Sequence, residues 1–98
     1  MEKFIKRGAG SQLIYRNGSA GTIEIYDIKV NRPDWRKGIG SDMIRELIET
    51  ENPHCLYCFM RKDNVDAHGF YLANGFKEVA VIENFYEEDC KDAIMLTR

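Results

Sequence analysis

The chain has 98 residues, of which 44% are hydrophobic and 31% charged, and its formal net charge is −2. A chain of this length forms one domain with a modest core, which we expect to span residues 1–98, and the charge balance gives no reason to expect nucleic-acid binding. No apolar run approaches the roughly 20 residues of a membrane helix, and residues 1–7 lack the hydrophobic core of a signal peptide, so we expect a cytoplasmic protein without a membrane partner.

The first third of the chain is predicted to form three strands. Residues 3–7 and 12–16 are short candidates, and Asn17-Gly18 is a strong signal for a hairpin turn. Residues Thr22–Val30 alternate with period two, and we expect them to form the longest strand. Its two faces would carry Ile23, Ile25 and Asp27 on one side and Glu24, Tyr26, Ile28 and Val30 on the other.

Helices and strands alternate in the rest of the chain. Residues Ser41–Glu51 carry apolar side chains at the spacing of a core-facing helix. Cys55–Met60 is a short apolar run, typical of a strand buried on both faces. A second helix is predicted at Val65–Ala73, followed by strands at Phe76–Ile82 and Ala93–Thr97. This order predicts a mixed α/β fold of one sheet and two helices.

A glycine loop, Arg36-Lys37-Gly38-Ile39-Gly40-Ser41, lies between the long strand and the first helix. The first N–H groups of a helix have no partner inside it and carry the positive end of its dipole, so anions bind there. Gly38 and Gly40 lack the β-carbons that would hold a phosphate away, and Arg36 and Lys37 add positive charge. The loop is therefore a candidate pyrophosphate site. The alternative is a glycine turn beside two solvated basic residues.

A second segment combines six residues at fixed spacing: Asn64, Ala67, Phe70, Tyr71, Gly75 and Phe76. Together with the glycine loop, this segment resembles the GNAT superfamily of N-acetyltransferases. The loop of that superfamily reads Gln/Arg-x-x-Gly-x-Gly/Ala, and its later motif reads Asn-x-x-Ala-x-x-(apolar)-Tyr-x-x-x-Gly-Phe. The resemblance covers about residues 22–98, and Trp35 replaces the usual Gln/Arg. It implies an acyl-CoA N-acyltransferase-like mixed sheet whose strands at 22–30 and 55–60 splay apart.

The resemblance also implies acetyl-CoA as co-substrate. The pantetheine would pair with the backbone of Ile28, Lys29 and Val30, and the pyrophosphate would lie on the N–H groups of residues 36–41. Asn64 would hydrogen-bond the cofactor from the start of the second helix. Asn64 is also a good helix N-cap, and the two roles are compatible.

The resemblance makes Tyr71 the general acid. A phenol near the sulfur can protonate the CoA thiolate when an attacking amine displaces it. The alternative is that Tyr71 is a core aromatic. A backbone N–H of the first splayed strand would polarise the thioester carbonyl.

Glu24 is the candidate base that takes the amine proton. It lies fourteen residues before Gly38, where the histone-acetyltransferase branch keeps its base glutamate. We expect it to share a face with Ile28 in partly apolar surroundings, which raise the pKa of a carboxyl. The alternatives are an edge-strand carboxylate, or Asp27 with a water chain. In the ribosomal-protein N-acetyltransferases the base lies on the next strand, and Phe59 occupies that position here.

The acceptor is expected to be an amine of a protein or peptide. Only 21 residues precede Thr22, too few for the strand and two helices with which the family normally opens, so we expect an open acceptor cleft. Asn84-Phe85-Tyr86 and the later Asp92-Ala93-x-Met95 resemble the peptide N-terminal acetyltransferases, which hold the peptide with this loop. The acidic run Glu87-Glu88-Asp89 would attract a cationic amine, or is a solvated loop.

These observations predict direct transfer of acetyl to a protein α-amine or lysine in a ternary complex. A small-molecule amine acetyltransferase and a non-catalytic acyl-CoA-binding module remain alternatives. A homodimer would cover the exposed strand edges of so small a sheet.

Metal binding and disulfides are not expected. Cys55 and Cys58 imitate a metal or redox motif, but residues three apart on a strand point to opposite faces, so we interpret both as core residues. Cys90 is expected in a loop, and the odd number of cysteines does not indicate a disulfide framework. No zinc spacing is present.

Overall fold

The computed structural model describes residues 1–8, 10–31 and 38–98, and these divide into two compact units, Met1–Cys55 and Leu56–Arg98. The elements follow the predicted order of three strands, helix, strand, helix and two strands. They are β1 (Glu2–Arg7), β2 (Ser11–Asn17), β3 (Thr22–Lys29), α1 (Ile39–Glu51), β4 (Cys55–Arg61), α2 (Val65–Ala73), β5 (Lys77–Tyr86) and β6 (Lys91–Thr97). A single domain over residues 1–98 stays a prediction, as does the splay between the two predicted strands.

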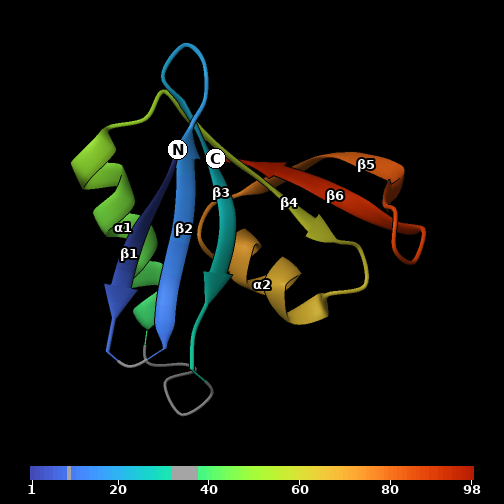
Figure 1. Cartoon of the computed structure of the whole chain (residues 1–98), viewed down its shortest axis with the longest axis horizontal. Helices are drawn as coiled ribbons and strands as arrows, with labels where there is room; N and C mark the ends of the chain where they lie inside the picture. The colour runs from blue at the N-terminus through green and yellow to red at the C-terminus, as the bar shows by residue number, and fades with distance from the viewer. Residues whose placement is uncertain (9, 32–37) are drawn as a thin grey trace. The chain divides into compact units, whose positions relative to one another are not determined.

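The first unit is an antiparallel sheet in the order β1-β2-β3, and α1 packs against β1 and β2 (Figure 1). The Asn17-Gly18 turn is confirmed, because the N–H of Gly18 donates to the carbonyl of Thr22 at 2.8 Å. Met43 and Leu47 of α1 are fully buried, and each contributes about 1.5–3 kcal/mol of hydrophobic stabilisation. The core of this unit consists of Ile5, Leu13, Tyr15, Ile23, Ile25, Met43, Ile44 and Leu47.

The helix α1 begins at Ile39, two residues before its predicted start at Ser41. Its N-cap is Gly38, whose φ of 77° and ψ of 10° lie in the left-handed region that glycine adopts without steric cost. The helical backbone therefore begins directly after the first loop glycine, and Gly40 lies inside the first turn rather than before it.

A β-bulge interrupts β3 at Tyr26. The pairing with β2 steps from Tyr15 opposite Ile25 to Ile14 opposite Asp27, so Tyr26 has no residue opposite it. Such an insertion breaks the period-two alternation on which the assignment of faces depends.

The predicted faces of β3 are therefore wrong beyond Ile25. Leu13 is fully buried and lies opposite Ile28, so Ile28 shares the helix-covered face with Ile25. Asp27 moves to the other face, where it joins Glu24. Glu24 and Ile28 consequently lie on opposite faces, and the strand ends at Lys29 rather than at Val30.

The second unit is an antiparallel sheet in which β6 lies between β4 and β5. Its core consists of Leu56, Cys58, Met60, Tyr71, Phe76, Ala93, Ile94 and Leu96. The alternate residues of β4, including Cys55, are only half-buried, so the prediction of a strand buried on both faces is wrong in part. The helix α2 has its predicted bounds, and a side-chain contact of 3.3 Å between His68 and Glu78 joins it to β5.

The longest strand is β5, with ten residues, so the prediction that residues 22–30 form the longest strand is wrong. It continues to Tyr86, four residues beyond the predicted end at Ile82, through two irregularities of register. At the second, the N–H of Asn84 donates to the side chain of Asp92 at 3.0 Å. The edge strand thus includes Glu83, whereas the acidic run Glu87-Glu88-Asp89 lies in the turn between β5 and β6.

Candidate functional site

The start of α1 presents an exposed glycine. A β-carbon built on Gly38 would meet no atom within 4 Å among the described residues, and no described side chain caps this helix end. The N–H groups of Ile39, Gly40 and Ser41 belong to the first turn, where helical N–H groups lack a partner inside the helix. The geometry of these residues is therefore compatible with a bound anion. Arg36 and Lys37, like Trp35, lie outside the described residues.

Charged side chains surround the first two turns of α1. The Nε of Arg7 donates to Asp42 at 3.2 Å, and its Nη2 pairs with Glu46. Asp42 also accepts from Arg45 at 3.3 Å. The hydrogen bond to Glu46, ahead of the bond to Asp42, raises the pKa of Arg7. This group of charges was not anticipated from the sequence, because Arg7 is 35 residues from Asp42.

Glu24 is 15% exposed and pairs with Arg16, whose Nε lies 3.0 Å from its Oε1. The guanidinium of Arg16 also lies 4.8 Å from the ring centre of Tyr26. The hydrogen bond to Glu24 raises the pKa of Arg16. The expectation of apolar surroundings shared with Ile28 is wrong: Glu24 faces a cation on the side of the sheet that α1 leaves uncovered. Its role as a base stays a prediction.

Asn64 and Tyr71 lie on the same helix, α2. The Oδ1 of Asn64 accepts from the N–H of Ala67 at 3.1 Å, which confirms the predicted N-cap. Tyr71 is 5% exposed, and its ring lies 5.1 Å from that of Phe76 and 5.4 Å from that of Phe70. The aromatic-core interpretation of Tyr71 is therefore correct as far as packing is concerned. A catalytic role for its hydroxyl stays a prediction.

The stop of α2 fixes the position of Tyr71. The N–H of Phe76 donates to the carbonyl of Tyr71 at 3.0 Å, and the N–H of Gly75 donates to Leu72 at 3.1 Å. These bonds form a Schellman motif, which requires the left-handed φ of 87° at Gly75. The glycine and phenylalanine of the sequence motif thus fix the backbone of Tyr71, which lies two residues before the last helical residue, Ala73.

The predicted site residues are distributed over both units. The first unit holds Glu24, the backbone of residues 28–30 and the start of α1, and the second holds Asn64 and Tyr71. Along β3, Ile28 is half-buried opposite Leu13, and Lys29 is exposed opposite Gln12. Their assembly around one co-substrate stays a prediction.

An aromatic surface in the second unit was missed by the sequence analysis. It consists of Tyr57, Phe59, Phe85 and Tyr86, with ring-centre distances between neighbours of 5.0 to 6.0 Å. Phe59 and Phe85 are stacked at 15°, and Phe85 is 41% exposed. The spacing of Tyr57 and Phe59 along β4 was the available signal, because residues two apart share a strand face.

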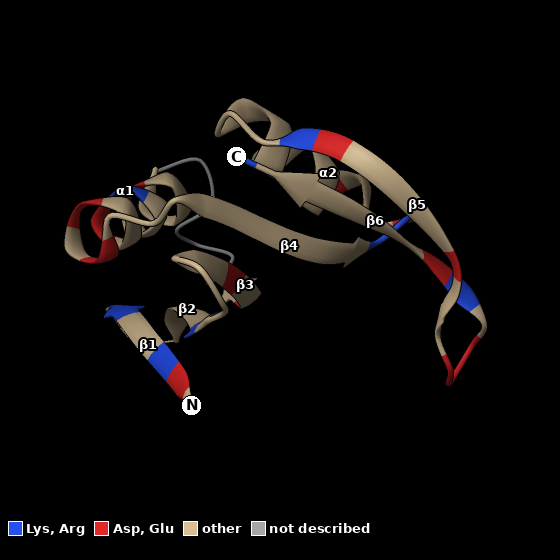
Figure 2. Ribbon diagram, turned by 90° about the horizontal axis from the view of Figure 1, so that it is seen from above, with Lys and Arg blue, Asp and Glu red and all other residues tan. Residues whose placement is uncertain are grey.

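Arg61 connects the aromatic surface to the acidic run. Its guanidinium lies 4.2 Å from the ring centre of Tyr86 and 2.6 Å from Oδ2 of Asp89, and Glu88 is 3.9 Å away. Figure 2 shows these acidic residues in red at the tip between β5 and β6. All three acidic residues are exposed in the turn, as the solvated-loop alternative expects, and Asp89 is in addition hydrogen-bonded to Arg61.

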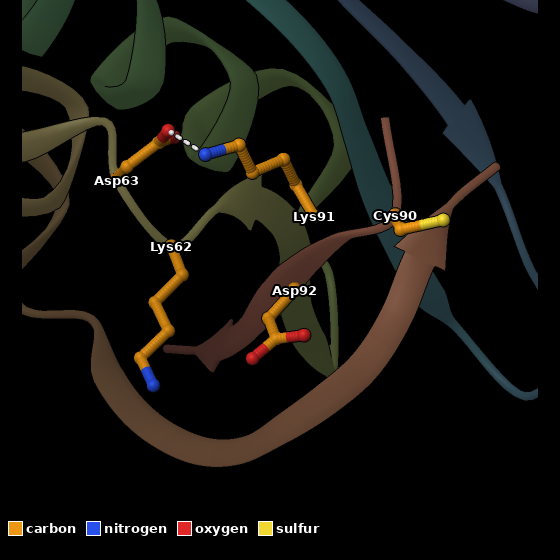
Figure 3. A pocket seen from close by; sticks show the side chains of 5 residues that line it. All are labelled: Lys62, Asp63, Cys90, Lys91 and Asp92. Atoms are coloured by element: carbon orange, nitrogen blue, oxygen red, sulfur yellow. Dashed lines mark ion pairs between the residues drawn. The ribbon is translucent and has the colours of Figure 1, made fainter. Parts of the chain in front are cut away.

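A cavity of about 360 Å³ is lined by none of the predicted catalytic or cofactor-binding residues, although Asp63 directly precedes Asn64, and Figure 3 shows its lining side chains. They are Lys62, Asp63, Cys90, Lys91 and Asp92. Lys91 pairs with Asp63 at 3.5 Å. In the described ranges of the chain, no group of three His, Cys, Asp or Glu side chains could hold a metal ion, and no helix there is long and apolar enough to cross a bilayer.

Residues 7–76 match the sequence model of the Acetyltransferase (GNAT) family. The N-alpha-acetyltransferase RimI of Mycobacterium tuberculosis (strain ATCC 25618 / H37Rv) is 29% identical over 75 residues, which are 76% of this chain and 48% of that protein. The chain thus spans about half the length of this relative.

Solved structures of acetyltransferases have a similar fold. The ribosomal-protein-S18-alanine N-acetyltransferase of Escherichia coli has a TM-score of 0.76 at 20% identity, over 96% of this chain and 67% of that one. An acetyltransferase of Bacillus subtilis, solved in complex with CoA, has a TM-score of 0.79 at 17% identity, over 96% and 72%. The predicted fold class, a mixed α/β acyl-CoA N-acyltransferase fold, is confirmed by these likenesses.

Proposed function

The chain belongs to the acetyltransferase (GNAT) family, and from this premise we propose that it transfers the acetyl group of acetyl-CoA to a primary amine. The observation that carries the proposal is the family match over residues 7–76, which includes both the glycine start of α1 and the segment from Asn64 to Phe76. The CoA bound to the Bacillus subtilis structure supports the same co-substrate.

Acetyl-CoA would bind with its pyrophosphate at the start of α1. The exposed Gly38 and the N–H groups of Ile39, Gly40 and Ser41 support this placement, and Arg36 and Lys37 would add positive charge. The pantetheine would follow the backbone of residues 28–30. Asn64 would contribute the NH₂ of its amide, because its Oδ1 is already bonded to Ala67.

In the proposed reaction the acceptor nitrogen attacks the thioester carbonyl carbon, so that a C–N bond forms and the C–S bond breaks. Tyr71 donates its phenolic proton to the departing sulfur and recovers a proton from solvent. Glu24 takes the proton that the amine loses, directly or through water. Asp27 lies on the same face of β3 as Glu24 and is the second candidate for this step.

We propose that the acceptor is the α-amine or a lysine of a protein or peptide. The half-exposed aromatic surface supports this, since rings stacked at a surface bind apolar side chains at low cost in conformational entropy. Its members Phe85 and Tyr86 belong to the Asn84-Phe85-Tyr86 segment that resembles the peptide N-terminal acetyltransferases. The likeness to an N-alpha-acetyltransferase and to a ribosomal-protein-S18-alanine N-acetyltransferase favours a protein α-amine.

A cytoplasmic location and a homodimer complete the proposal. The edge strand β5 supports the dimer, because Val79 and Val81 on it are 54% and 45% exposed and its outer backbone groups can pair with a second copy.

Calorimetric titration with acetyl-CoA tests the co-substrate site through a pair of variants. Asn and Asp both tolerate the left-handed conformation at Gly38, so Gly38→Asn and Gly38→Asp differ mainly in charge. We expect saturable binding by the wild type, weaker binding by Gly38→Asn and none by Gly38→Asp. Equal affinity of the two variants for acetyl-CoA would show that the pyrophosphate does not bind at this helix end.

A second experiment identifies the acceptor class by comparing the rate of acetylation of a panel of peptides with that of a panel of small amines.

A further inference from the structure

Arg7 is held in one orientation by three hydrogen bonds. Its Nε donates to Asp42 at 3.2 Å, its Nη2 pairs with Glu46, and its Nη1 donates to the backbone carbonyl of Lys6 at 3.0 Å. Every nitrogen of the guanidinium thus has an acceptor, and the planar fork is fixed at the end of β1. Figure 2 shows this end of β1 in blue and the acidic residues of α1 in red.

The ion pair between Arg7 and Asp42 lies next to the helix end at which the co-substrate is proposed to bind. Asp42 lies in the first turn of α1, beside the N–H groups proposed to hold the pyrophosphate. A carboxylate there stabilises the free helix through the dipole, but it repels an incoming phosphate. Asp42 is half exposed, so its charge acts on a ligand in the adjacent solvent. Among the described residues, Arg7 and Arg45 form ion pairs with it.

We propose that Arg7 is a positioning residue for acetyl-CoA binding, which neutralises Asp42 and so keeps the start of α1 attractive to the pyrophosphate. Arg7 acts through Asp42 and not by contact with the co-substrate. This inference rests on the proposed function, because it needs the pyrophosphate at the start of α1.

A purely structural role would have a different signature. If Arg7 only ties β1 to α1, then Arg7→Gln and Asp42→Asn both remove a strand–helix ion pair, and neither should change affinity in a direction set by charge. The proposal instead requires opposite effects on affinity from the two single substitutions. Once Asp42 is replaced, Arg7→Gln should have no further effect, so the double variant should bind like Asp42→Asn.

The experiment measures the Kd for acetyl-CoA by calorimetry for Arg7→Gln, Asp42→Asn and the double variant at low salt. We expect Arg7→Gln to raise Kd roughly three- to tenfold and Asp42→Asn to lower it by a similar factor. The double variant should bind like Asp42→Asn, whereas a Kd close to wild type would mean that Arg7 acts on the co-substrate independently of Asp42. Added salt should reduce all these differences. Dephospho-CoA, which keeps the pyrophosphate, should give the same pattern.

Lys3→Gln is the matched control. Lys3 is also a β1 cation paired with a carboxylate of α1, but its partner Glu51 is the last residue of that helix, at the opposite end from Gly38. A Kd change in Arg7→Gln no larger than in Lys3→Gln, or weaker binding by Asp42→Asn, would overturn the inference while leaving the proposed function standing. Absence of binding by the folded wild type would overturn both. Asp42→Asn keeps the Arg7–Glu46 pair, so it decides the question even if Arg7→Gln does not fold.

Discussion

The phenol of Tyr15 donates a hydrogen bond of 2.8 Å to Oε2 of Glu51 and so joins the middle strand β2 to the last turn of α1. Burial, assisted by this bond, raises the pKa of Tyr15 to about 12. The same bond is the largest cause that lowers the pKa of Glu51. We predict that Tyr15→Phe lowers the free energy of unfolding by about 1 kcal/mol, measured by urea denaturation. Tyr26→Phe, at a ring that is 53% exposed, is the control and should leave the midpoint unchanged.

The ionisation of Tyr15 and Glu51 should also make the free energy of unfolding depend on pH. The folded-state pKa of Glu51 lies below its ordinary 4.5, so its contribution is complete above that pH and is lost as the pH falls through the folded value. The pKa of Tyr15 is raised, so its contribution is complete below pH 10.0 and is lost as the pH rises toward about 12. In both of these pH ranges, the urea denaturation midpoint of Tyr15→Phe should change less with pH than the midpoint of the wild type.

Tyr71→Phe should lower kcat with little change in the affinity for acetyl-CoA. The ring keeps its contacts with Phe70 and Phe76, so we expect the fold to be retained, while the phenolic proton donor is lost. General acid catalysis of this kind contributes about 10²- to 10⁴-fold. Steady-state kinetics with calorimetric Kd values measure the two quantities separately. Unchanged turnover would leave Tyr71 as a core aromatic alone.

Glu24→Gln and Asp27→Asn form a matched pair of neutral variants on one face of β3. If Glu24 is the base, its variant should lose about 10²-fold or more in kcat, whereas Asp27→Asn should remain close to wild type. The reverse pattern would transfer the role of base to Asp27. Circular dichroism should accompany the kinetics, because Glu24→Gln also removes the ion pair with Arg16.

Asn64→Asp separates the two roles assigned to that residue. A carboxylate caps the helix as well as the amide does, so the melting temperature should hold, whereas Asn64→Ala should cost about 1 kcal/mol. Both Asp and Ala lack the NH₂ donor, and Asp also adds a negative charge, so the affinity for acetyl-CoA should fall in both variants. Full affinity in Asn64→Asp would limit Asn64 to capping.

Phe85→Ala tests the aromatic surface. Because Phe85 is 41% exposed, its removal should cost little stability, but it should raise the KM for peptide acceptors while the Kd for acetyl-CoA is unchanged. Phe4→Ala, which removes a 52% exposed ring from β1, is the control. A KM that rises equally in both variants would contradict a specific role for the aromatic surface.

The sequence predicted best the features that depend on neighbouring residues. The bounds of α2 were correct because Asn64 caps its start and Gly75 alone supplies the left-handed stop. The end of β5 was missed because Glu83 and Asn84 lead into an acidic run, Glu87-Glu88-Asp89, that indicates a loop and does lie in the turn after the strand.

The sequence motifs located candidate site residues, but the sequence did not predict the ion pairs formed by charged residues in the fold. The motif residues Asn64 and Tyr71 could be located by spacing alone. The pairing of Arg7 with Asp42 and of Arg61 with Asp89 joins residues 35 and 28 positions apart, and only the tertiary fold brings them together. The surroundings of Glu24 were misjudged because alternation cannot reveal an inserted residue.

The bulge at Tyr26 makes that residue supernumerary. Without it, β3 would alternate regularly, with Ile23, Ile25 and Ile28 toward α1 and Glu24 and Asp27 away from it, which are the sides these residues already occupy. A chain shortened by this one residue would satisfy the hydrophobic demands of the sheet equally well. The hydrophobic pattern of the sheet therefore gives no reason for the chain to contain Tyr26.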